Sequence, residues 1–313
     1  MSDYLDRLIG FAASVSLQTL PAAVIHTGKN ALIGAVGKIL SGMLQPEVQA
    51  LSQQMAEASI APCSTILGTP LRADAMWAAL AHGTAGAWHE LKTKDRAVEA
   101  SPVLYAASAG LPVAEREGAS GRRLLESVIA GYEVGTRIGQ ATTLRPGMDP
   151  HGSWPIVAAS LTTGLLAGTD LRKTVNLVTS LNLATSSRAA EEGATIRNIY
   201  AGFGSAMGVL AADLCRDGFS AERDGLRTVF GTIAGVSFDA DKATEKLGTV
   251  WIMKADDERN LHPTFLNLVS KTIGPQQAET LLQQLLQIED IATVREILSL
   301  TCKGNIHASH LDP

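Results

Sequence analysis

Ionisable side chains that could carry acid–base chemistry gather in one short stretch of an otherwise apolar chain. Residues 81–103 join a helix rich in small residues to a charged turn, which contains His89, Glu90, Lys92, Lys94, Asp95, Arg96 and Glu99. Glu90 is a candidate proton acceptor at the rim of a cleft. Because Glu90 and Lys94 are four residues apart, they could equally form a surface ion pair worth about 0.3–0.5 kcal/mol. We expect this segment to form one wall of an active site.

A second candidate, His151, lies in a loop rich in chain-breaking residues, RPGMDPHG (145–152). The loop leads into a helix predicted over 153–167, with Ser153 near its N-cap. A helix N-terminus attracts anions through its free N–H groups and its dipole. A histidine beside it could therefore act as a general acid or base on a carboxylate substrate. A purely structural hydrogen bond of His151 is the alternative.

A third cluster, Arg197, Asn198 and Tyr200, opens a helix in the segment GATIRNIYAG. Arginine can hold a carboxylate with two parallel hydrogen bonds, and tyrosine can donate a proton. An ordinary first helical turn with a salt bridge would use the same residues. No nucleophile triad, phosphate-binding loop or dinucleotide fingerprint accompanies these clusters.

Helices must position all of these groups, because apolar residues recur at helical spacing along most of the chain. The predicted helices include 3–16, 45–59, 73–91, 121–142, 153–167, 171–183, 198–215, 263–272, 276–287 and 291–299, and one starts near Pro21. Ser120 and Asp170 are predicted N-caps. Gly204 and Gly208 serve either tight packing in the core or a dimer interface. A short strand is possible at 249–253.

Composition limits the class of protein. The chain has 313 residues, of which 46% are hydrophobic and 18% charged, so it can bury a sizeable core. Aromatic residues make up only 4%, which favours closely packed helices with small side chains. The net charge of −5 and the lack of a basic stripe argue against nucleic acid as a partner. Three separated cysteines predict free thiols and no metal site. No signal peptide or membrane span is predicted, so we expect a cytoplasmic protein.

Five stretches together resemble the MmgE/PrpD family, which includes 2-methylcitrate dehydratase, cis-aconitate decarboxylase and iminodisuccinate epimerase. They are LGTPLRADAMWAALAHGTAGAWHEL, GASGRRLLESVIAGYEVGTRIGQAT, RPGMDPHGSWPIVAAS, EGATIRNIYAGFGSAMGVLAADL and DGFSAERDGLRTVFGTIAG. The resemblance implies a mainly α fold, with a large all-helical domain over 1–238 and a shortened α+β lid region over 239–313. It also implies a homodimer, no cofactor and small polycarboxylate substrates. The implied chemistry is proton abstraction beside a carboxylate, followed by loss of water or carbon dioxide, or by reprotonation.

The chain departs from the family pattern at the charged turn. A pattern like WLELDEGNRFARGHP reads here WHELKTKDRAVEASP, so Lys92 and Thr93 replace an acidic pair and Ser101 replaces a histidine. In the loop, a pattern like HPHGTW reads DPHGSW, which keeps one histidine. The lid pattern is reduced to MKADDERNLHPTFLNL, where Lys254, Arg259 and His262 match with a small gap. The wall becomes more basic, which favours an anionic substrate.

Two functions follow from the resemblance and these departures. The first is a lyase or isomerase with an altered pocket that acts on a small carboxylic acid. The second is a catalytically degenerate member that serves as a structural or regulatory partner of a complete paralogue. For the enzyme, the predicted catalytic residues are His151, Glu90, Arg197 and Tyr200. The predicted substrate-binding residues are Arg96, Ser153, Lys92, Ser101 and His262.

Overall fold

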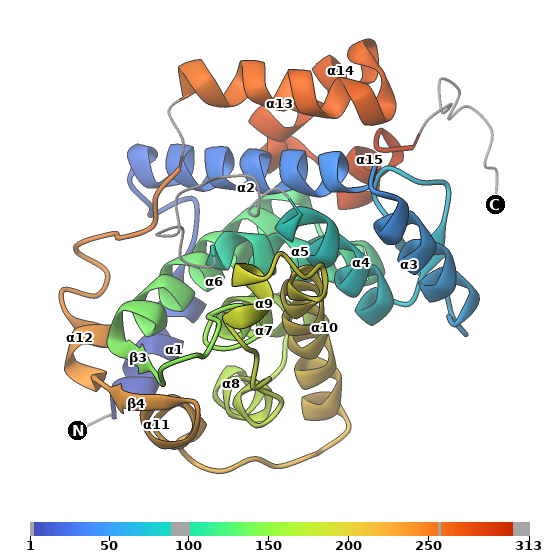
Figure 1. The fold of residues 1–313 in the computed structure, drawn as a ribbon. Coiled ribbons are helices and arrows are strands. Elements are labelled where there is room, and N and C mark those ends of the chain that lie inside the picture. Colours follow the sequence, from blue (N-terminus) through green and yellow to red (C-terminus); the bar gives the residue numbers. More distant parts are fainter. Residues whose placement is uncertain (1–2, 89–100, 256–257, 303–313) are drawn as a thin grey trace.

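Helices dominate the computed structural model, which describes residues 3–88, 101–255 and 258–302 (Figure 1). The main helices are α1 (Tyr4–Ser14), α2 (Ala22–Gly42), α3 (Pro46–Glu57), α4 (Ala75–Ala87), α5 (Pro102–Arg116), α6 (Gly121–Ala141), α7 (Ile156–Ala167), α8 (Leu171–Ser180), α10 (Ile196–Arg216), α13 (Glu258–Ile273) and α14 (Pro275–Leu286). The shorter ones are α9 (Arg188–Glu191), α11 (Gly225–Thr228), η2 (Val229–Ile233), α12 (Ala240–Thr244), η3 (Ile288–Asp290) and α15 (Val294–Ser299). Two small antiparallel sheets pair β1 (Ser64–Thr65) with β2 (Arg72–Ala73) and β3 (Thr142–Leu144) with β4 (Gly235–Phe238). The predicted mainly α fold is confirmed.

The helices pack around α4, α5 and α7. Helix α4 contacts α2, α5 and α10, and α7 contacts α5, α6 and α10. Helix α13 lies along α2, with α14 beside it, on the face away from α7 and α8 (Figure 1). Phe265 and Val269 of α13 belong to the same buried apolar cluster as the preceding helices. The division of the chain after residue 238 stays a prediction.

Local capping signals set several helix starts. The Ser120 hydroxyl accepts the backbone N–H of Arg123, and the Asp170 carboxylate accepts that of Lys173, at 3.2 and 3.0 Å. Both predicted N-caps are thus confirmed, and caps of this kind contribute about 1 kcal/mol each. Helix α7, in contrast, starts at Ile156 and not at Ser153. The Ser153 hydroxyl donates to the carbonyl of Pro150 at 2.7 Å, so it stabilises the loop and leaves the helix uncapped.

Glycines allow the central helices to approach closely. A Cβ atom on Gly83 of α4 would lie 2.6 Å from the Ala201 carbonyl of α10, well inside van der Waals contact. Gly204 and Gly208 face Tyr105 of α5 and Ala159 of α7. Their four-residue spacing therefore serves tight packing in the core, the first of the two roles considered from the sequence.

The strand expected over 249–253 is not formed. Residues 251–255 are in neither a helix nor a strand, although they are well placed for hydrogen bonds to α6. The Glu133 carboxylate accepts the N–H groups of Ile252 and Met253 at 3.0 Å each, and Arg137 donates to the carbonyl of Val250 at 2.5 Å. Side chains of α6 thus take the place of the strand partner that the prediction required.

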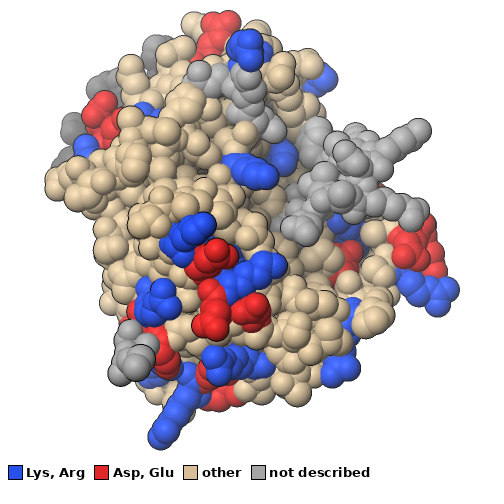
Figure 2. All heavy atoms as spheres, turned by 90° about the vertical axis from the view of Figure 1, so that its left-hand side faces the viewer, with Lys and Arg blue, Asp and Glu red and all other residues tan. Residues whose placement is uncertain are grey.

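The surface mixes charges of both signs. On the face that carries α1 and α12, Figure 2 shows Lys and Arg side chains next to Asp and Glu. Arg172 forms ion pairs with Asp3 and Asp6 at 2.7 and 2.6 Å. The hydrogen bond from Arg172 lowers the pKa of Asp3 to about 2. Among the described helices, none combines the length and the apolar character that crossing a membrane requires.

Candidate active site

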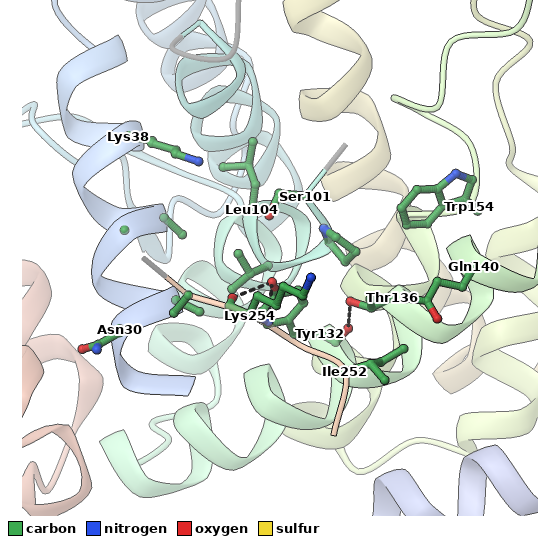
Figure 3. A pocket seen from close by; sticks show the side chains of 16 residues that line it. Asn30, Lys38, Ser101, Leu104, Tyr132, Thr136, Gln140, Trp154, Ile252 and Lys254 are labelled. Atoms are coloured by element: carbon green, nitrogen blue, oxygen red, sulfur yellow. Dashed lines mark hydrogen bonds between the residues drawn. The ribbon is translucent and has the colours of Figure 1, made fainter. Parts of the chain in front are cut away.

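A cavity of about 500 Å³ lies between α2, the start of α5, α6 and the segment 252–255 (Figure 3). Its polar and charged lining includes Asn30, Lys38, Ser101, Thr136, Gln140 and Lys254. Trp154 adds an aromatic wall from the loop that precedes α7. The cavity is thus built from segments far apart in sequence, and it has the size of a small-molecule site.

The described residues of the lining carry a positive charge. Among the described lining residues, Lys38 and Lys254 are the only charged ones, and neither ammonium group forms an ion pair or a hydrogen bond with another residue that the structure describes. Two such ammonium groups in a concave site raise the local concentration of anions. The lining therefore favours a ligand with one or more carboxylates.

Tyr132 of α6 fixes the backbone of Lys254. Its hydroxyl donates to the Lys254 carbonyl at 2.7 Å and accepts the Lys254 N–H at 3.2 Å. Thr136 donates to the Tyr132 carbonyl at 2.8 Å, one turn along the same helix. These contacts hold Lys254 at the edge of the cavity, as Figure 3 shows.

His151 is fully buried in the loop before α7. Its Nδ1 atom lies 3.2 Å from the hydroxyl of Tyr105, and that hydroxyl also accepts the N–H of Gly152 at 3.0 Å. The direction of the bond between the phenol and Nδ1 depends on the imidazole tautomer. The two contacts of the Tyr105 hydroxyl join α5 to the loop that carries His151.

Arg197 contacts a carboxylate of the chain itself. Its Nε atom lies 3.4 Å from one oxygen of Asp149, whose other oxygen accepts the N–H of His151 at 2.8 Å. The salt bridge left open from the sequence is therefore present, and it joins α10 to the loop. Asn198, next in the chain, is fully buried, and both polar atoms of its amide have no hydrogen-bond partner among the residues that the structure describes.

The remaining predicted residues lie in different places. Glu90, Lys92 and Arg96 fall outside the described residues. Ser101 lines the cavity at the start of α5, whereas Ser153 is buried in the loop. Tyr200 is half-buried on α10, one turn after Arg197.

His262 stands apart from both groups. It is half-buried on α13 and is not among the described residues that line the cavity. The side chain of its neighbour Leu261 lies 3.6 Å from the position that a Cβ atom on Gly34, a lining residue, would take. The structure thus brings His151 and Arg197 together through Asp149, and Ser101 together with Lys254. Trp154 is the residue that joins the loop to the cavity.

Sequence reasoning missed Lys38 and Asp149. Lys38 is the single charged residue in the apolar run GAVGKIL, which was the signal available for it. Asp149 stands two residues before His151, a position from which aspartate side chains commonly bond a loop backbone. Among the described residues, no three or more His, Cys, Asp or Glu side chains converge as metal ligands would.

Comparison with known proteins bears on the part of the chain that forms the body and most of the cavity. The profile of the MmgE/PrpD N-terminal domain matches residues 6–245. This span contains Lys38, Ser101, His151 and Arg197, while Lys254 lies beyond it. No curated protein matches the chain.

Proposed function

Because the chain belongs to the MmgE/PrpD family, we propose that it is a lyase or isomerase that binds a small polycarboxylate in the cavity lined by Lys38 and Lys254. One observation carries the proposal: Lys38 and Lys254 line a cavity whose described residues include no carboxylate, and neither ammonium group has an ionic partner within the part of the chain that the structure describes. A cavity of about 500 Å³ is large enough for a polycarboxylate of six or seven carbons. At Lys92 and Ser101 the sequence differs from the family pattern, and we propose that these two differences change which acid the protein binds.

The charge of the lining suits proton abstraction beside a carboxylate. When a base removes the proton on the carbon next to the carboxylate, the electron pair spreads onto the carboxylate oxygens. The ammonium groups of Lys38 and Lys254 would stabilise this added negative charge more than the charge of the bound substrate. The electron pair then expels hydroxide, which leaves as water once it is protonated, or it takes a proton back on the other face. In a decarboxylation, proton abstraction is replaced by cleavage of the bond to a carboxylate: carbon dioxide leaves, the electron pair stays on the carbon that carried it, and a proton added to that carbon completes the product.

The residues proposed as general acid and base are the candidates that the sequence analysis identified. We propose His151 as the general acid or base and Glu90 as a relay. His151 is fully buried and is not among the described residues that line the cavity, so this role requires the loop 145–152 to open toward the bound acid. Arg197 holds Asp149, so its role is to fix the loop that carries His151.

Binding of a non-reactive acid tests the site. Tricarballylate, a tricarboxylate without a leaving group, should bind the wild-type protein in isothermal titration calorimetry. Lys38→Gln and Lys254→Gln should each weaken binding about tenfold or more, the loss of one charge-assisted contact. Lys271→Gln, on the exposed side of α13, is the matched control and should leave affinity unchanged. Equal affinities of all four proteins would contradict the proposed site.

Turnover separates the reaction types. The protein is incubated in D2O with 2-methylcitrate, cis-aconitate and iminodisuccinate, and the products are followed by NMR. Deuterium incorporation beside a carboxylate without loss of mass indicates an isomerase, whereas loss of water or carbon dioxide indicates a lyase. Absence of both exchange and product with every acid that binds would contradict the enzyme.

A further inference from the structure

We propose that Tyr132, Glu133 and Arg137 of α6 form a clamp that positions Lys254, by holding the backbone of the segment 245–255 against the helix. We call these three residues the α6 clamp and the segment the strap. The inference rests on the proposed function, because it explains how one of the two cationic groups of that site is placed. The clamp residues are positioning residues and act through Lys254.

The clamp bonds six backbone groups of the strap, on residues 245, 250, 252, 253 and 254. The Glu133 carboxylate accepts the N–H groups of Ile252 and Met253 at 3.0 Å each. Tyr132 engages the carbonyl and the N–H of Lys254. The carbonyls of residues 245 and 250 accept the two terminal nitrogens of Arg137, at 2.7 and 2.5 Å.

The clamp is buried and internally paired. The side chains of Glu133 and Arg137 are 0% and 2% exposed, and Arg137 Nε lies 2.8 Å from the Glu133 carboxylate. Burial of two charges is costly unless hydrogen bonds satisfy them, and the strap backbone supplies those bonds. The strap in turn depends on the clamp, since residues 251–255 have no helix or strand to satisfy their backbone groups.

The α6 clamp positions Lys254 and forms no hydrogen bond with Lys38, the other lysine among the described residues of the cavity lining. Lys254 directly follows Met253, whose N–H is bound by Glu133, and Ile252 and Lys254 both line the cavity. Lys38 lies on α2 and makes no contact with the strap through hydrogen bonds. Release of the strap should therefore change Lys254 selectively, which a general loss of stability would not do.

Acetylation of lysines tests this selectivity without any ligand. The initial acetylation rates of Lys254 and Lys38 are measured by mass spectrometry in the wild type and in Glu133→Gln. Glutamine places an NH2 group toward backbone donors, so the strap should shift and Lys254 should react faster, with the rate at Lys38 unchanged. Glu126→Gln is the matched control, because Glu126 lies on the same helix and binds the backbone N–H of Leu17, remote from the strap. It should alter neither rate.

A double-mutant cycle tests the consequence for binding. Glu133→Gln should weaken tricarballylate binding by about the same tenfold factor as Lys254→Gln, because both remove the same charge-assisted contact. In the Glu133→Gln protein, Lys254→Gln should have little further effect, whereas Lys38→Gln should keep its full effect. Additive losses for Glu133 and Lys254 would overturn the clamp.

Other outcomes are equally decisive. An unchanged Lys254 rate, or equal acceleration at Lys38 and Lys254, overturns positioning by the clamp. If Glu133→Gln does not fold, Tyr132→Phe replaces it, since it removes the bonds to Lys254 without leaving a buried charge unpaired. If wild-type protein does not bind tricarballylate, the proposed function fails, while the acetylation rates still decide the clamp.

Discussion

Protonation of His82 should destabilise the protein as the pH falls. His82 lies on α4, fully buried, and its Nε2 atom accepts the backbone N–H of Leu67 at 3.1 Å. Burial disfavours the imidazolium ion and lowers the pKa of His82 from 6.5 to about 4, although hydrogen bonds at the backbone of Ser108 and Thr65 oppose part of this effect. The folded protein therefore holds a neutral histidine.

The sign follows from proton binding. Between pH 6.5 and 4 the unfolded chain binds a proton at this site and the folded chain does not, so acid favours unfolding. The stability contributed by neutral His82 is complete above pH 6.5, falls progressively below that pH, and is fully lost once the pH has fallen through about 4. At about 1.4 kcal/mol per pKa unit, the full loss is about 3 kcal/mol, of which about 2 kcal/mol is lost by about pH 5.

Urea unfolding at pH 7, 6 and 5 measures how much neutral His82 contributes to the free energy of unfolding. His82→Gln keeps an acceptor oxygen for the N–H of Leu67 but cannot be protonated. The free-energy advantage of the wild type over His82→Gln should shrink by about 2 kcal/mol between about pH 7 and pH 5. A pH-independent difference between wild type and His82→Gln would refute the reasoning.

Four further predictions address packing, capping and catalysis. Asn198→Leu should leave thermal stability unchanged or raise it, since a buried unpaired amide costs about 1–3 kcal/mol; a clear fall in Tm would contradict this. Ser120→Ala should lower the free energy of unfolding by about 1 kcal/mol in urea titration, and no change would show that the cap is dispensable. Gly202→Ala should destabilise by about 1–3 kcal/mol because its Cβ has no room, whereas Gly10→Ala, in open space on α1, should stabilise slightly; equal effects would contradict the close approach of α4 and α10. His151→Ala should slow turnover of any accepted acid by about 10²–10⁴-fold, and unchanged turnover would remove His151 from the mechanism.

The sequence by itself determined the helical fold, the helix starts at Ser120 and Asp170, and the family. These features depend on residues within a few positions of one another, such as an N-cap and the N–H three residues later, so a local pattern is sufficient. The sequence also showed that His151 and Arg197 belong to polar clusters, and it left open a salt bridge for Arg197.

Only the tertiary structure decided which groups meet. The bond from Ile252 to Glu133 joins positions 119 residues apart, and no local pattern indicates it. The same bond explains the wrong strand prediction, because the apolar character of residues 249–253 fits a strand and also fits a strap bound by α6. Lys38 and Lys254 likewise reach one cavity from α2 and from the strap. The helices could be inferred from their own residues, whereas the cavity exists only because distant segments pack together, and that packing depends on the shapes of all their side chains at once.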